Sequence, residues 1–261
     1  MRPLSLAASA TLALLLGAAP AAAQDVAAHI AAGDAARCER NSQAALAHYR
    51  EALGLDSLNY EANWKASREL TDIGKLMPDA QRDARDSVYA EALAFAQRAV
   101  RLDSMGADGH YMVAVAAGRV ALTKSAHERV KSANVVRDAA LRAIALDPRH
   151  DGALHVMGRW NAEIMRLPGI TKFFARTFLG ASIFNAASWD SSFAYYGRAI
   201  QINPQNIYHH LDLAEALIDD HRPTEAQPHL EEVARLPLGC DPGDSTYKAQ
   251  AAALLHKITL R

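Results

Sequence analysis

Four segments of the chain end with one pattern of apolar and polar positions. An Ala is followed one and three positions later by aliphatic residues. Asp or Asn comes next, and Pro or Ser follows it. In the first segment the residue between the two aliphatic positions is Gly. The segments are 52–57, 99–104, 143–148 and 199–204. A small residue lets a neighbouring helix approach, the aliphatic residues anchor the helix, and the Asp or Asn with Pro or Ser ends it. The pattern therefore predicts a series of helices.

A small residue follows each closing Ser or Pro by ten positions, at Ser67, Ala114, Gly158 and Ala214. An earlier segment fits the same register with Gly33. We expect these residues to lie where the first helix of each pair crosses the second.

This ending and spacing resemble the tetratricopeptide repeat. We therefore expect an all-α, tetratricopeptide-like helix-pair solenoid of about five repeats. The three middle repeats are lengthened, which predicts an insertion in the fourth, over residues 166–187. A last apolar stripe predicts a capping helix over 244–260 that covers the end of the array. Its residues are Tyr247, Ala251, Leu254, Leu255 and Ile258.

Residues 150–160, which include Gly158-Arg159-Trp160, are followed by Leu167-Pro168, an aromatic-rich stretch and Tyr195-Tyr196. This region resembles the regulator of microtubule dynamics family. The resemblance covers most of the chain and implies a divergent tetratricopeptide solenoid with interaction and tethering roles, among them microtubule association and lipid contact.

Residues 1–23 combine a positive start, an apolar stretch of about 15 residues and a small-residue ending, which is typical of a cleaved signal peptide. A retained membrane anchor is the alternative, but the stretch is shorter than the roughly 20 residues that span a bilayer. We expect one repeat domain over 24–261, exported to the periplasm or secreted, without a transmembrane span. An exported protein would not meet microtubules. From the resemblance we therefore expect only the fold and partner binding to apply to this chain.

Removing the signal leaves 27 basic and 29 acidic residues, which disfavours nucleic acid as a partner.

Cys38 and Cys240 lie near opposite ends of the chain. Because an extended solenoid would hold them apart, we expect both to be unpaired.

Two positions of each first helix face the groove in which such solenoids hold ligands. Position five lies three residues before the crossing residue, and position nine lies one residue after it. Arginines beside aromatic rings would suit a ligand with an anionic head and an apolar body. The alternative is that Arg68 and Arg159 are satisfied within the solenoid. The groove positions are Trp64, Arg68, Tyr111, Val115, His155, Arg159, Leu211 and Glu215.

The insertion is basic and carries an apolar face at Ile170, Phe173, Phe174 and Phe178. Such a helix can bind a membrane surface, a lipid or a partner helix, or can fill its own groove.

Histidine pairs 150/155 and 209/210 lack the spacing of metal ligands, so we expect no metal site. No nucleophile elbow, phosphate loop, dinucleotide fingerprint or HExxH motif occurs, so we expect no catalysis and no cofactor.

The sequence predicts a non-catalytic module that binds a peptide or partner protein. The alternative is a carrier of an apolar ligand such as a phospholipid.

Overall fold

The computed structural model describes residues 18–121, 126–167 and 186–260. Within these ranges the chain forms eleven α-helices and one short 3-10 helix, without a strand. The helices are α1 (Ala18–Cys38), α2 (Ser42–Leu55), α3 (Tyr60–Leu76), η1 (Asp79–Gln81), α4 (Arg82–Leu102), α5 (Ala107–Ala121), α6 (Ala126–Leu146), α7 (Asp151–Arg166), α9 (Trp189–Ile202), α10 (Ile207–Asp219), α11 (Pro223–Arg235) and α12 (Asp244–Thr259).

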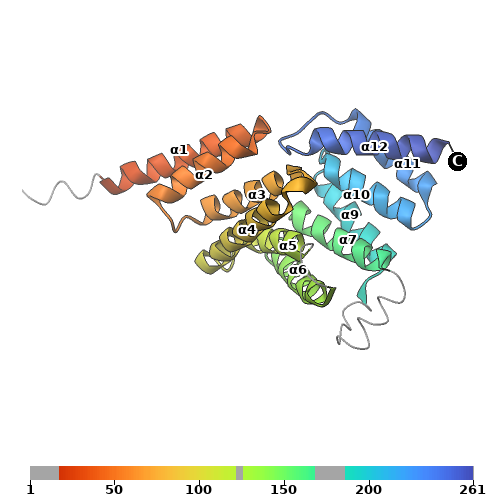
Figure 1. Cartoon of the computed structure of the whole chain (residues 1–261), viewed down its shortest axis with the longest axis horizontal. Helices are drawn as coiled ribbons and strands as arrows, with labels where there is room; N and C mark the ends of the chain where they lie inside the picture. The colour runs from red at the N-terminus through yellow and green to blue at the C-terminus, as the bar shows by residue number, and fades with distance from the viewer. Residues whose placement is uncertain (1–17, 122–125, 168–185, 261) are drawn as a thin grey trace, which may run out of the picture.

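Consecutive helices pack as antiparallel pairs, and the pairs follow one another along a curved array (Figure 1). The pairs are α1/α2, α3/α4, α5/α6, α7/α9 and α10/α11, with α12 packed on α10 and α11. This confirms the predicted all-α solenoid of five helix pairs with a final capping helix.

The repeated sequence ending forms the last hydrogen bond of each second helix. The backbone N–H groups of Asp56 and Asn203 donate to the carbonyl groups of Ala52 and Ala199, both at 2.9 Å. After two of these endings the next helix begins at an Asn side chain, Asn59 before α3 and Asn206 before α10. The Asn59 carboxamide oxygen, for example, accepts from the backbone of Ala62 at 2.9 Å and satisfies a free N–H group at the start of α3.

The predicted crossing residues are all buried. At Gly158 the reason is direct, because a Cβ atom there would lie 2.8 Å from the ring of Tyr196 on α9. A Cβ atom at Gly33 would likewise overlap the ring of Tyr49 on α2. At these two pairs a tyrosine of the second helix occupies the space that a larger side chain would need.

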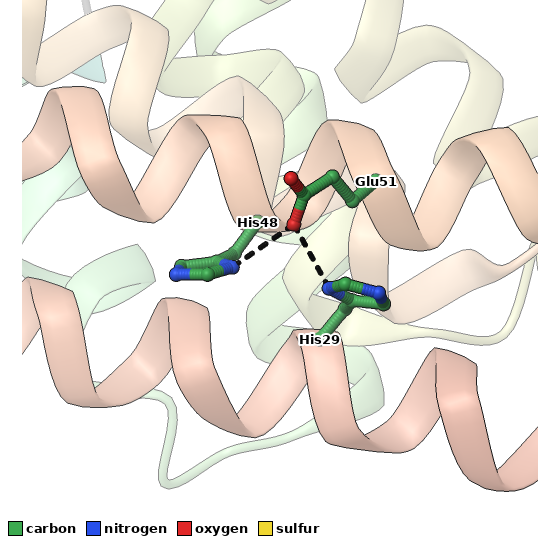
Figure 2. A group of neighbouring side chains, drawn as sticks. All are labelled: His29, His48 and Glu51. Atoms are coloured by element: carbon green, nitrogen blue, oxygen red, sulfur yellow. Dashed lines mark hydrogen bonds and ion pairs between the residues drawn. The ribbon is translucent and has the colours of Figure 1, made fainter.

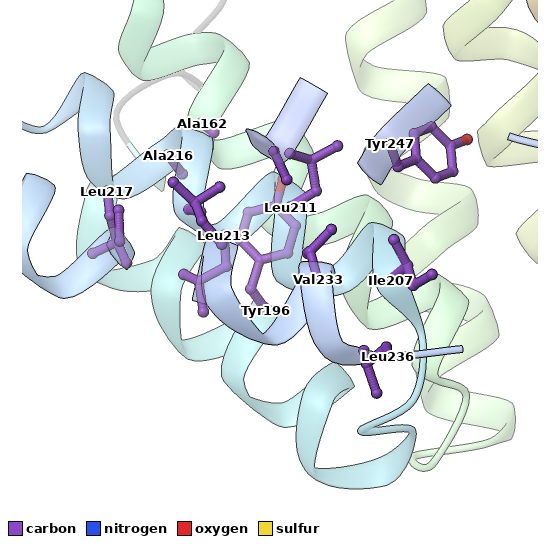
Figure 3. Close-up of a cluster of buried hydrophobic side chains, with 14 residues drawn as sticks. Ala162, Tyr196, Ile207, Leu211, Leu213, Ala216, Leu217, Val233, Leu236 and Tyr247 are labelled. Carbon is purple, nitrogen blue, oxygen red and sulfur yellow. The ribbon is translucent and has the colours of Figure 1, made fainter. Parts of the chain in front are cut away.

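The largest hydrophobic cluster lies in the last two pairs and α12. Figure 3 shows Tyr196, Leu211, Val233 and Tyr247 among its side chains. Leu254, Leu255 and Ile258 of α12 pack against the cluster, so the final helix covers apolar surface that α10 and α11 would otherwise expose.

Cys38 and Cys240 form a disulfide, with their Cα atoms 4.0 Å apart. The expectation that both are unpaired was therefore wrong. It assumed an extended solenoid, whereas the array curves until the end of α1 meets the loop before α12 (Figure 1). Arg40 also donates to the Gly239 carbonyl at 3.3 Å across this junction.

The first helix begins at Ala18 and continues through Ala23, the position after which we expect signal cleavage. None of the described helices has the length and apolar character needed to cross a bilayer. The signal peptide and the domain boundaries stay predictions.

Candidate functional site

The first helices α3, α5, α7 and α10 form one row, and α12 follows α10. At the other end α1 joins this row through side-chain hydrogen bonds to α3. We call these helices the inner row. The disulfide joins α1 to the loop before α12, so the array curves toward this row, and the second helices lie outside it. The predicted groove residues are all on α3, α5, α7 and α10.

Buried ion pairs connect α1 with α3. The Arg37 guanidinium donates to the carboxylates of Glu69 and Asp72, both at 2.8 Å. Lys75 lies 3.2 Å from Asp72. Burial disfavours the charge of Asp72, but Lys75 and Arg37 outweigh it and lower the pKa of that carboxyl group.

Trp64 and Arg68 lie one turn apart on α3, as the groove prediction requires. The Arg68 guanidinium is 5.2 Å from the centre of the Trp64 ring, and it donates to Glu69 at 2.9 Å. It also donates to the Tyr49 hydroxyl at 3.2 Å. Arg68 is thus engaged within the solenoid, which is the alternative that the sequence left open.

A second polar cluster connects α7 with α10. Arg159 donates to Asp212 at 3.2 Å and to the hydroxyl group of Tyr208. The Nε2 atom of His155 is 3.2 Å from the same carboxylate. Although Asp212 is buried, the Arg159 guanidinium beside it lowers its pKa to about 2, and burial lowers the pKa of His155 to about 4.

This cluster continues through His209. The Nδ1 atoms of His155 and His209 are 3.0 Å apart, and Nε2 of His209 is 3.0 Å from Asp151. The sequence suggested the pairs 150/155 and 209/210, whereas the structure pairs His155 with His209 from a different helix. His210 likewise lies against His229, with their Nδ1 atoms 3.2 Å apart.

Two tyrosines and a lysine join the two clusters. The rings of Tyr208 and Tyr247 stack with their centres 4.5 Å apart. The Lys75 ammonium group lies 5.3 Å from the Tyr208 ring and donates to the Tyr247 hydroxyl. Lys75, Tyr208 and Asp212 were not predicted from sequence, and Tyr247 was predicted only as part of the capping helix. Tyr208 lies at the start of α10 and Lys75 at the end of α3. Both are outside positions five and nine, so the groove pattern did not include them.

The other predicted groove residues differ in exposure. Leu211 is 1% exposed, inside the hydrophobic cluster, and has no surface to offer a ligand. Tyr111 is half-buried against His150, with ring centres 4.7 Å apart. Val115 is half-buried on the same helix. Glu215 is half-buried, and burial together with the Asp212 charge raises its pKa to about 7.

A hollow of about 390 Å³ opens between α1 and the start of α3. It corresponds to the groove of the first repeat, since Ile30 and Asp34 are three residues before and one residue after the crossing residue Gly33. Its wall is mostly apolar, and polar groups stand at its rim. The lining residues are Val26, Ala27, Ile30, Ala31, Asp34, Asn59, Glu61 and, in the chain before the expected signal cleavage, Ala23.

The predicted amphipathic face of the insertion, Ile170, Phe173, Phe174 and Phe178, lies outside the described residues.

Solved structures that share this fold include two TPR-type proteins. A thermophilic TPR protein of Thermus thermophilus superposes with a TM-score of 0.64 at 16% sequence identity, over 88% of this chain and 99% of that one. PilF of Pseudomonas aeruginosa superposes with a TM-score of 0.52 at 12% identity, over 91% and 93%. These similarities show the tetratricopeptide-type fold.

Relatives in sequence are regulators of microtubule dynamics. Regulator of microtubule dynamics protein 1 of Bos taurus is 24% identical over 153 residues, which are 59% of this chain and 47% of that protein. The human protein is 23% identical over 145 residues, 56% of this chain and 45% of its own length. The chain thus matches about half the length of these relatives. The family profile described as Regulator of microtubule dynamics protein 1-3 matches residues 29–259. This match spans most of the sequence, and the chain therefore belongs to the family of regulators of microtubule dynamics proteins 1-3.

Proposed function

We propose that the protein is a non-catalytic interaction module that binds a peptide segment of a partner protein along its inner row, starting in the hollow between α1 and α3. The observation that carries this proposal is the hollow itself. Its volume of about 390 Å³ lies in the range of about 300–1,000 Å³ that is typical of ligand sites. Its position is the groove of the first repeat.

The chemistry of the hollow favours an apolar side chain next to a basic one. Ala27 and Ala31 are exposed on its apolar wall. At the rim, Lys65 is buried between Asp34 at 2.5 Å and Glu61 at 2.6 Å. Lys65 and Arg68, which is 3.8 Å from Asp34, are 8% and 22% exposed, whereas the two carboxylates are about half exposed, so the more exposed groups of the rim are acidic.

The half-buried ring of Trp64 extends this surface along α3. Aromatic residues of this kind contribute much of the binding energy at protein interfaces. Arg68 and Arg159 already pair with carboxylates, so they would have to give up these partners to hold an anionic ligand. This argues against the anionic head that the two arginines suggested from sequence.

The alternative, a carrier of an apolar ligand such as a phospholipid, depends on the insertion, and nothing in the described residues favours it. We infer an exported location from the signal-like first 23 residues and from the disulfide, which persists in oxidising compartments.

The proposal is tested by site-specific photocross-linking in cells. Benzoylphenylalanine at Ala27 and at Trp64 should cross-link the same partner, whereas the probe at Gln97, exposed on α4, should not. A partner captured equally well from Gln97 would overturn the proposal.

A charge inserted in the hollow gives a second test. Ala27→Lys should lower the recovery of that partner at least fivefold, because it fills the apolar wall and places a positive charge next to the basic side chain that the hollow favours. Ala28→Lys is the matched control, since Ala28 is exposed on the same helix but does not line the hollow. Equal recovery with both variants would exclude this site.

A further inference from the structure

Three side chains converge on the outside of the first helix pair. The Nδ1 atom of His29, on α1, is 2.9 Å from a carboxylate oxygen of Glu51, on α2 (Figure 2). The Nδ1 atom of His48, also on α2, is 3.1 Å from the same oxygen. His48 and Glu51 are three residues apart and therefore share one face of α2.

We propose that His29, His48 and Glu51 form a zinc site that links α1 to α2. One donor atom from each residue lies within 4.8 Å of the others. Donors held at about 2.0–2.1 Å around a tetrahedral Zn²⁺ lie about 3.3 Å apart. The two imidazole–carboxylate distances, 2.9 and 3.1 Å, therefore need to lengthen by a few tenths of an ångström. The two imidazole donors lie within 4.8 Å of each other and need to approach by at most about 1.5 Å, which side-chain rotation can supply.

The donor set determines the class of metal. Two imidazoles and one carboxylate suit Zn²⁺ and its neighbours in the transition series, whereas Mg²⁺ and Ca²⁺ prefer oxygen ligands. The site supplies three protein ligands, so one position of a tetrahedral ion would hold water. The histidine side chains are 35% and 38% exposed and that of Glu51 is 54% exposed, so the ion can enter directly from solvent.

The location gives binding a structural effect. Of the described helices, α1 packs mainly on α2, and its last turn is fixed by the disulfide at Cys38. His29 is more than two turns before that cysteine. A metal ion at His29 would therefore fix the part of α1 that also forms the apolar wall of the hollow.

Zinc titration of the untagged protein by isothermal calorimetry tests the proposal. We expect one equivalent of Zn²⁺ to bind, and Mg²⁺ and Ca²⁺ to give no heat. His29→Ala and His48→Ala should each weaken binding at least tenfold. Glu51→Gln keeps the size of the side chain and should weaken binding in the same direction. His256→Ala, which removes an exposed histidine on α12, is the control and should leave binding unchanged.

A spectroscopic readout excludes adventitious binding. Co²⁺ in place of zinc should give the visible absorption of a tetrahedral nitrogen and oxygen site, and His29→Ala should abolish this absorption. Circular dichroism should show equal helix content in all variants. The proposal is overturned if the unmodified protein gives no zinc heat, or if the His29→Ala and His48→Ala double variant binds zinc as tightly as the unmodified protein. The result is independent of partner binding, because none of the three residues lines the hollow.

Discussion

The ammonium group of Lys75 donates a hydrogen bond to the hydroxyl group of Tyr247, 172 residues later in the chain, and lies 5.2 Å from the centre of that ring. This contact connects α3 to α12 across the inner row. Tyr247→Phe removes the acceptor but keeps the ring, so it should lower the free energy of unfolding by about 1–2 kcal/mol. Urea denaturation followed by circular dichroism measures the change.

Tyr195→Phe is the matched control for this prediction. Tyr195 packs against a hydrophobic cluster, and no hydrogen bond of its hydroxyl group is found in the described residues. Its replacement should change stability by less than about 0.5 kcal/mol. If both variants unfold at the same urea concentration as the unmodified protein, the Lys75–Tyr247 contact contributes nothing to stability.

The disulfide closes a segment of 202 residues. Replacing Cys38 and Cys240 together by Ser should lower the free energy of unfolding by about 2–4 kcal/mol, because the unfolded chain regains the freedom that the bond removes. Both cysteines are exposed, so dithiothreitol should shift the unmodified protein toward the midpoint of the variant. An unfolding midpoint that is insensitive to reductant would contradict this expectation.

Two glycines allow crossing geometry to be separated from helix propensity. Gly158→Ala places a methyl group 2.8 Å from Tyr196 and should destabilise the protein by about 1–3 kcal/mol. Gly197→Ala, inside α9, meets no atom within 4 Å and should stabilise by about 0.5–1 kcal/mol. Thermal melts of the two variants should therefore shift in opposite directions. Shifts of the same sign would show that packing against Tyr196 is not what requires a small residue at this crossing.

Glu215 should make stability depend on pH. Its pKa is raised to about 7 in the folded protein from an ordinary value of 4.5, so the folded state holds the proton more tightly than the unfolded state. The protonated Glu215 carboxyl group contributes to the free energy of unfolding at low pH. This contribution is lost as the pH rises from about 4.5 through 7. Glu215→Gln should therefore stabilise by about 1–2 kcal/mol at pH 8, a value reduced for partial exposure, and by almost nothing at pH 4.5.

Urea unfolding at the two pH values checks this expectation. A Glu215→Gln variant whose advantage is the same at pH 4.5 and pH 8 would show that the carboxyl group keeps its ordinary pKa.

The helix pairs could be predicted from sequence because the signals are local. The Asp and Asn residues that end the helices act within four positions, and the small crossing residues sit a constant distance further on. Among the inner-row residues, Trp64, Arg68, His155 and Arg159 could be identified from the spacing, and their role in ligand binding stays a prediction. Asp212 meets Arg159 through the packing of α10 on α7. Lys75 and Tyr247 meet only through the curvature of the whole array.

Curvature is also why the cysteine prediction was wrong. Small rotations between successive helix pairs add up over the length of the array, and no single repeat encodes their sum. Only coordinates of the complete array could show that Cys38 meets Cys240.

A stack of helix pairs ordinarily frays from its outermost members, because each pair is supported only by its neighbours. In this molecule the end of α1 is bonded to the loop before α12 through Cys38 and Cys240, and α3 of the second pair contacts α12 through Lys75 and Tyr247. The first helix therefore cannot separate from the array unless its bond to the other end of the array also breaks. Amide hydrogens of α1 and α12 should exchange at nearly the same rate as those of central helices, and reductant should restore the graded protection of an open array.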